Sequence, residues 1–239
     1  MTDKGECSFL EHCGRVTQLS GCISLSVSNK IAIFGQTFIS MAIFYHGSSV
    51  LFPKFDLTHI LEGDGKVKFG YGVYLTSSFK SAAHYSGANK SASTHYVYTV
   101  EVPELTEDNH IDFKNHVPPN LVERAENKLG ISIPHTISLD GKAFRKFLAK
   151  YFEKQICIDL AEGASLSKTL QLAGERDASE FLIGIGVEFI TWPYSWRNPD
   201  LGMNVAVFDD KKVRIVKIHQ VELDNKQQLI AGSEKEVKL

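Results

Sequence analysis

Cysteine is scarce in this sequence, and the few cysteines are not spaced for a zinc site or a disulfide framework. Four occur among 239 residues, at Cys7, Cys13, Cys22 and Cys157. They are too few and too scattered to form a framework of cross-links. No Cys-x-x-Cys pair is present to hold a structural zinc ion, and we interpret His12 as an exposed side chain beside an incidental thiol. The sequence therefore predicts no bound metal.

Neither sign of charge is in excess. The chain has 26 lysines and arginines against 28 aspartates and glutamates, a formal net charge of −2. Such a balance gives no long-range attraction to nucleic acid or to an anionic membrane, and we expect neither as a partner. The hydrophobic fraction of 43% and the charged fraction of 23% are typical of a globular protein. A chain of this length can bury an ample core in one large domain, and we expect a monomer.

Long apolar runs are also missing. Lys4 is followed by polar sequence, with no apolar stretch of the kind that a cleavable secretory signal carries. The uncharged segment 31–45 is shorter than the ~20 residues that a membrane helix needs, and polar residues and glycine interrupt it. We expect two buried strands there, at 31–34 and 38–45.

Hydrophobic periodicity predicts an α+β chain with strands at both ends and helices in the middle. Strand patterns occur at 23–27, 31–34, 38–45, 73–76, 95–102, 187–192, 204–208 and 213–218. Helical spacing occurs at 79–85, 121–129, 143–152 and 166–183. The last two strand patterns are separated by a four-residue turn and predict a hairpin.

These patterns suggest a division of the chain into an N-terminal extension, one main domain and a tail. We assign residues 1–30 to the extension and residues 31–223 to the domain. Within the domain, residues 118–186 form a helical subdomain inserted between sheet strands. Residues 224–239 are polar, and we expect them to be a frayed tail.

A glycine-punctuated turn, Phe69-Gly70-Tyr71-Gly72-Val73-Tyr74-Leu75-Thr76, is the most informative stretch. Its glycines permit positive φ angles or a close approach to a ligand. Serine and threonine then offer N-caps for a helix that carries Tyr85. Tyr74 from the strand and Tyr85 from the helix could close on a flat ring from two sides. Taken alone, the stretch also fits an ordinary strand-to-helix corner with two core tyrosines.

An upstream block, His46-Gly47-Ser48, follows another apolar run and changes this interpretation. The two blocks together resemble the ADP-ribosyltransferases of the diphtheria-toxin and poly(ADP-ribose) polymerase type. Their signature is His-Gly-Ser/Thr, then Gly-x-Gly-hydrophobic-Tyr, then a helix with a second tyrosine, which corresponds to Tyr85. The resemblance implies an α+β fold with a split antiparallel β-sheet core, here carrying the inserted helical subdomain. It also implies NAD as co-substrate, with Ser48 among the residues that bind it.

The third part of that signature differs at one residue. The family's third strand has the form x-Val-hydrophobic-Phe/Tyr-Asp, in which x is glutamate in the polymerases and in most of the toxins. Asn204 occupies that place here, so the triad is His46, Tyr74 and Asn204. Asparagine can hydrogen-bond a ribose hydroxyl but carries no charge. We therefore expect transfer of single ADP-ribose units and not polymer synthesis.

The resemblance also implies what each matched residue does. Backbone groups of Gly47 would bind the amide of nicotinamide, and Tyr74 and Tyr85 would flank its ring. A serine that binds the same amide in the polymerases corresponds to Ser81 or to Ala82. His46 would bond a ribose hydroxyl on the adenosine side, and Asn204 would hold the other ribose.

A hydroxyl acceptor would also need a base. Glu222, Glu188 and Asp209 are the acidic candidates near the final strands. We favour Glu222, because a returning strand could bring it towards the cleft of the sheet. Each of the three is otherwise interpreted as a solvated carboxylate.

Three functions remain open at this stage. The first is an NAD-dependent protein mono-ADP-ribosyltransferase, an effector delivered into the host-cell cytoplasm by a type III-like route without a cleavable signal. Its overall plan resembles the small effector family, seen in Chromobacterium, that modifies ubiquitin on a threonine, which makes ubiquitin the best candidate acceptor. The second is NAD hydrolysis or RNA-directed transfer, although the near-neutral charge disfavours RNA. The third is a non-enzymatic binding module that kept the fold.

Overall fold

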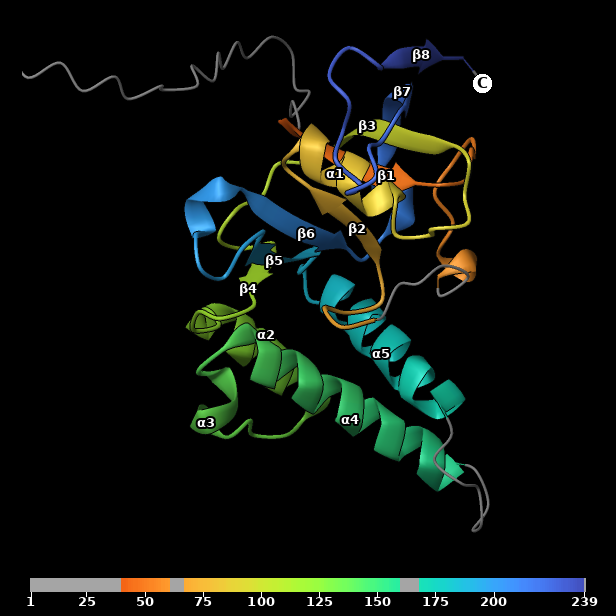
Figure 1. Cartoon of the computed structure of the whole chain (residues 1–239). Helices are drawn as coiled ribbons and strands as arrows, with labels where there is room; N and C mark the ends of the chain where they lie inside the picture. The colour runs from red at the N-terminus through yellow and green to blue at the C-terminus, as the bar shows by residue number, and fades with distance from the viewer. Residues whose placement is uncertain (1–39, 61–66, 160–167, 239) are drawn as a thin grey trace, which may run out of the picture. The chain divides into compact units, whose positions relative to one another are not determined.

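The computed structural model describes residues 40–60, 67–159 and 168–238, which form an α+β structure (Figure 1). The strands are β1 (Met41–Ser48), β2 (Val73–Thr76), β3 (His95–Pro103), β4 (His110–Asp112), β5 (Phe189–Pro193), β6 (Met203–Val207), β7 (Arg214–Val221) and β8 (Lys235–Val237). The helices are α1 (Phe79–Ser86), α2 (Pro119–Leu129), α3 (His135–Ser138), α4 (Gly141–Asp159) and α5 (Lys168–Ile183). The strands predicted at 23–27 and 31–34 lie outside the described residues.

All eight strands belong to one mixed, mostly antiparallel sheet, in the order β4-β5-β6-β2-β1-β3-β7-β8. Its two halves join weakly. Every residue of β1 pairs with β3, whereas β1 and β2 pair only at Tyr45 and Thr76. This narrow junction lets the two halves diverge beside it, which leaves room between β1 and β2 for a site.

The sheet is mostly antiparallel, as expected, and differs from this expectation at one edge. β4 and β5 run parallel, with His110 opposite Phe189 and Asp112 opposite Thr191. Parallel neighbours need a long crossover connection. Here helices α2 to α5 supply it, and Figure 1 shows them grouped on one side of the sheet.

The predicted hairpin between residues 204–208 and 213–218 is also wrong. β6 pairs with β2 and β5, whereas β7 pairs with β3 and β8. A short 3₁₀ turn, Asp210–Lys212, carries the chain from one half of the sheet to the other. Val205 of β6 and Ile218 of β7 lie in the same buried cluster, so the two strands contribute to one core without pairing with each other.

The inserted helices follow the predicted pattern. Residues 121–129 and 143–152 fall within α2 and α4, and the described part of 166–183 is α5. The apolar stripe of α4 is core, as expected, because Phe144 and Leu148 are fully buried against the sheet. The short helix α3 was not predicted.

The C-terminal residues are ordered, contrary to the expected frayed tail. β8 pairs with β7, and Leu223 bridges to Leu229 just before it. The Asp224 carboxylate accepts the backbone N–H groups of Lys226 and Gln228, which closes the intervening turn. Polar composition did not prevent folding here, because side chain-to-backbone hydrogen bonds stabilise the turn and the few apolar residues, Leu223, Leu229 and Val237, pack against buried clusters. Across the described segments, no helix has both the length and the apolar content needed to cross a bilayer.

Candidate functional site

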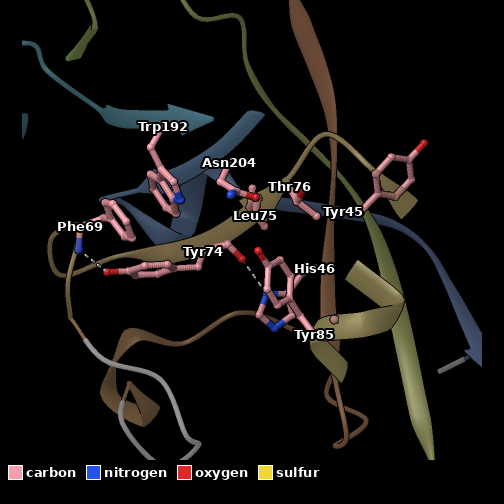
Figure 2. Close-up of a pocket in the computed structure, with 10 residues that line it drawn as sticks. Tyr45, His46, Phe69, Tyr74, Leu75, Thr76, Tyr85, Trp192 and Asn204 are labelled. Carbon is pink, nitrogen blue, oxygen red and sulfur yellow. Dashed lines mark hydrogen bonds between the residues drawn. The ribbon is translucent and has the colours of Figure 1, made fainter. Parts of the chain in front are cut away.

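A cavity of about 270 Å³ lies where β1, β2, β5, β6 and helix α1 meet (Figure 2). Its lining consists of Tyr45, His46, Gly47, Phe69, Tyr74, Leu75, Thr76, Tyr85, Trp192 and Asn204. Aromatic rings dominate, and none of these ten described residues carries a carboxylate, an ammonium or a guanidinium group. The cavity therefore brings together five residues that were predicted from separate segments: His46, Gly47, Tyr74, Tyr85 and Asn204.

His46 is held in one tautomer by the backbone of β2. Its Nδ1 lies 2.8 Å from the carbonyl oxygen of Tyr74, a contact drawn as a dashed line in Figure 2. Since a carbonyl only accepts, Nδ1 carries the proton. Burial lowers the pKa of His46, and the hydrogen bond to Tyr74 only partly opposes this shift. The ring is therefore neutral near pH 7, with Nε2 as a free acceptor, and the Phe55 ring stands perpendicular to it at 5.1 Å.

Tyr74 uses its hydroxyl to close the turn that precedes it. The oxygen accepts the Phe69 N–H at 2.9 Å and donates to the Gly70 carbonyl at 3.0 Å. Gly70 has a φ of +111°, which a residue with a side chain would rarely adopt. Burial raises the pKa of the Tyr74 hydroxyl to about 12. Tyr74 therefore presents its ring, and not an ionisable oxygen, to the cavity.

A stacked pair of rings, Phe69 on Trp192, completes this wall. Their centroids are 3.7 Å apart and their planes are parallel within 1°. The Trp192 ring also meets Tyr74 edge-on at 5.6 Å. We did not predict either residue for the site. Phe69 is the first residue of the glycine block, and Trp192 pairs directly with Asn204 across β5 and β6, so the register of two strands is what places it.

Helix α1 carries Tyr85 to the open side of the cavity. The helix begins as predicted, because the Ser78 side chain caps it by accepting the Ser81 N–H. Tyr85 is 45% exposed. Burial raises the pKa of its hydroxyl, nearby Tyr194 adds to the shift, and the Asn204 amide opposes it. Tyr85 thus faces solvent at one edge and Asn204 at the other.

Gly47 allows α1 to approach β1 this closely. A Cβ atom at position 47 would lie 1.8 Å from the Ala82 carbonyl oxygen, a distance that real contacts do not reach. Glycine is therefore required here by packing. The same close approach turns Tyr85 towards the cavity.

Asn204 is the polar centre of the site. It is 4% exposed, and in register it lies opposite Thr76 on one side and Trp192 on the other. Its Oδ1 atom is buried without a hydrogen-bond partner. An unpaired buried acceptor costs about 1–3 kcal/mol, and such groups call for a particular explanation. A ligand that donates an N–H or O–H group to Oδ1 would supply the partner.

The other predicted site residues lie outside the cavity lining. The Ser48 hydroxyl accepts the Val50 N–H at 3.0 Å, and Ser81 is buried within α1. Glu222 stands just after β7 with its side chain 63% exposed, 3.9 Å from the ammonium group of Lys235.

The two remaining acidic candidates and Ala82 make contacts that belong to the fold and not to the cavity lining. Glu188 pairs with Lys212, and Asp209 caps the 3₁₀ turn after β6. Ala82 is fully buried, with its carbonyl against Gly47. Among the residues that the structure describes, no three His, Cys, Asp or Glu side chains gather as a metal site would require.

Comparisons with known proteins found no match: no family model, no curated protein and no solved structure matches this chain.

Proposed function

We propose that this protein is an NAD-dependent mono-ADP-ribosyltransferase that releases nicotinamide and transfers ADP-ribose to a protein. We further propose that its sheet, narrowly joined between β1 and β2, is the split sheet of that class. One observation carries the proposal: the buried, unpartnered Oδ1 of Asn204 in a cavity walled by the rings of Tyr74, Tyr85 and Trp192. Support also comes from the order of the His46, Tyr74 and Asn204 motifs along the chain.

The cavity suits the nicotinamide end of NAD. The pyridinium ring of NAD is flat and positively charged, and the faces of aromatic rings attract cations. The carboxamide and the ribose hydroxyls offer the N–H and O–H donors that Asn204 Oδ1 needs. The neutral His46 Nε2 is a second acceptor for a hydroxyl group.

The chemistry follows from the bond that breaks. When the bond between the ribose C1′ and the ring nitrogen breaks, its electron pair leaves with neutral nicotinamide, and positive charge develops on the ribose. The acceptor oxygen then forms a bond to C1′ and gives up its proton to water. Asn204 can stabilise the cation only through its amide dipole, because it has no charge. We expect turnover to be slower than with a glutamate at this position.

The acceptor is a host protein in this proposal, with a threonine hydroxyl of ubiquitin as the best candidate. The effector would act in the host-cell cytoplasm after a type III-like delivery. This part rests on the resemblance in overall plan to the ubiquitin-modifying effectors and on nothing in the cavity itself.

A second candidate is a binding module that holds NAD without turning it over. The observation in its favour is that no described residue of the lining carries a carboxylate. The two candidates make the same contacts with the nicotinamide and differ only in whether the glycosidic bond breaks.

One experiment separates these functions. The purified chain is incubated with NAD labelled on the adenylate phosphate, alone, with purified ubiquitin, and with host-cell lysate. Label on a protein band supports the transferase, free labelled ADP-ribose supports a hydrolase, and saturable binding without either product supports the binding module. If the chain does not bind NAD at all, the proposal is wrong.

A further inference from the structure

Helix α5 is tied to the turn that carries the aromatic wall of the cavity. The backbone N–H of Tyr71, in the middle of the Phe69–Tyr74 turn, donates to the Ser179 hydroxyl oxygen at 3.0 Å. Ser179 lies on α5, 108 residues further along the chain, and is 3% exposed. This buried hydrogen bond joins the inserted helices to the cavity.

The turn has little freedom to move independently of Ser179. Its ends are closed by the Tyr74 hydroxyl, which bonds both Phe69 and Gly70. A Cβ atom at Gly70 would lie 2.8 Å from the Phe208 ring and 3.5 Å from the Ser179 oxygen, so the turn packs directly on both. A shift at Ser179 would therefore move the turn as a unit, including Phe69 and its stack on Trp192.

Helix α5 is itself fixed one turn before Ser179. Glu175 forms an ion pair with Arg145 of α4, whose side chain is buried. Burial raises the pKa of Glu175, and the Arg145 guanidinium opposes the shift. Both charges also act, in opposite directions, on the pKa of the Tyr74 hydroxyl, which burial raises most. The ion pair thus joins α4 to α5 one helical turn before Ser179.

We propose that Ser179 is a positioning residue of the cavity, holding the Phe69–Tyr74 turn so that Phe69 stays stacked on Trp192 and Tyr74 forms the wall. The inserted helices are then part of the framework of the site. The effect on ligand affinity rests on the proposed function. The effect on Trp192 does not, because it concerns the free protein.

The test uses the intrinsic fluorescence of Trp192. The chain has two tryptophans, so Trp196→Phe leaves Trp192 as the only one. In that background, Ser179→Ala should shift the Trp192 emission to longer wavelength and increase its quenching by acrylamide about twofold or more, because burial of the ring depends on the stack. Affinity for nicotinamide and for NAD should fall about tenfold, as expected for a wall that is no longer preorganised.

A matched variant controls for a general loss of stability. Glu126 on α2 accepts the Ile133 N–H at 2.7 Å and the Ser132 hydroxyl at 3.3 Å, and neither partner belongs to the Phe69–Tyr74 turn. Glu126→Ala should lower the melting temperature without changing Trp192 emission, quenching or affinity. In the parent protein, hydrogen exchange of the Tyr71 amide should be slow, and Ser179→Ala should accelerate it.

Two results would overturn the inference. One is a Ser179→Ala protein that is less stable but has parental Trp192 emission and quenching, since Ser179 would then be structural only. The other is fast exchange of the Tyr71 amide in the parent protein. If the parent protein binds neither nicotinamide nor NAD, the proposed function fails, while the emission and exchange measurements still decide the role of Ser179.

Discussion

At the scale of single residues, Asn204 lines the cavity and at the same time lowers the stability of the free protein. Its buried Oδ1 has no partner in the free protein. Replacing such a group by an apolar one of similar shape can be neutral or stabilising. Residues that are needed for function often lower the stability of the fold in this way.

We therefore expect opposite effects of substitution on stability and on activity at this position. Asn204→Leu should leave the free energy of unfolding unchanged or raise it by up to about 1–3 kcal/mol, measured by urea denaturation. Asn204→Ala should lose most NAD turnover while circular dichroism shows an intact fold. Near-normal turnover of Asn204→Ala would mean that β6 has been wrongly matched to the transferase signature.

His46 makes a prediction about pH. Burial lowers the pKa of His46 in the folded protein below the usual 6.5. At pH values between the folded and unfolded pKa values, the unfolded chain therefore binds the proton more readily than the folded protein does. Stability then rises with pH through this window and levels off above about 6.5. We expect the free energy of unfolding to fall as pH drops below about 6.5, and to fall less steeply in His46→Gln, which removes the titrating group. Equal slopes for the two proteins in urea titrations at each pH would contradict this account.

Four polar residues of the site could be found from the sequence because each belongs to a short motif, whereas Tyr45 and Thr76 were not predicted to line it. His46, Tyr74, Tyr85 and Asn204 were predicted in this way and line one cavity. Trp192 could not be found, because its place depends on the pairing of β5 with β6, and pairing is not written in a local pattern. Glu222 was favoured on an assumed hairpin, and the structure keeps it away from the cavity lining because β7 pairs with β3 and β8.

At the scale of elements, the close packing of β1 on α1 should be sensitive to one methyl group. In Gly47→Ala the new Cβ would meet the Ala82 carbonyl, so α1 must shift and Tyr85 must move with it. We expect a loss of about 1–3 kcal/mol in stability together with most of the NAD binding, measured by thermal unfolding and by titration.

Gly130→Ala is the matched control for this change. Gly130 ends α2 with a φ of +68° and has open space around it, so alanine there is strained without a clash. It should lower stability and leave NAD binding unchanged. Equal loss of binding in both variants would show that Gly47 matters only through global stability.

Element types could be predicted, whereas their pairing could not. Most strands and helices in the described segments fall close to their predicted ranges, since apolar periodicity reports which face is buried, whereas β4, β8 and α3 were not predicted. The link from β6 to β7 was misjudged, because a four-residue turn fits a hairpin or a corner between packed layers equally well. The order of β8 was missed, because the turn before it depends on hydrogen bonds to Asp224 and on only two leucines, which give no apolar periodicity.

At the scale of the whole molecule, the neutral residue in the triad predicts the form of the product. Chain extension requires activation of a ribose hydroxyl on the previous unit, a role that the resemblance assigns to the glutamate replaced by Asn204. We expect a single mass increment of one ADP-ribose on each modified site, measured by intact-protein mass spectrometry. A ladder of heavier products that collapses on treatment with a polymer-cleaving glycohydrolase would refute this expectation.

The central claim is that the cavity between β1, β2, β5, β6 and α1 is where NAD is bound and cleaved. The most direct measurement is the release of nicotinamide from NAD by the parent protein in the presence of host-cell lysate, compared with His46→Ala and Tyr74→Ala. Each substitution removes a positioning contact worth ~1–3 kcal/mol, so each rate should fall roughly tenfold or more. The account predicts release by the parent protein and this loss in both variants. Unchanged release by a folded His46→Ala protein would contradict it.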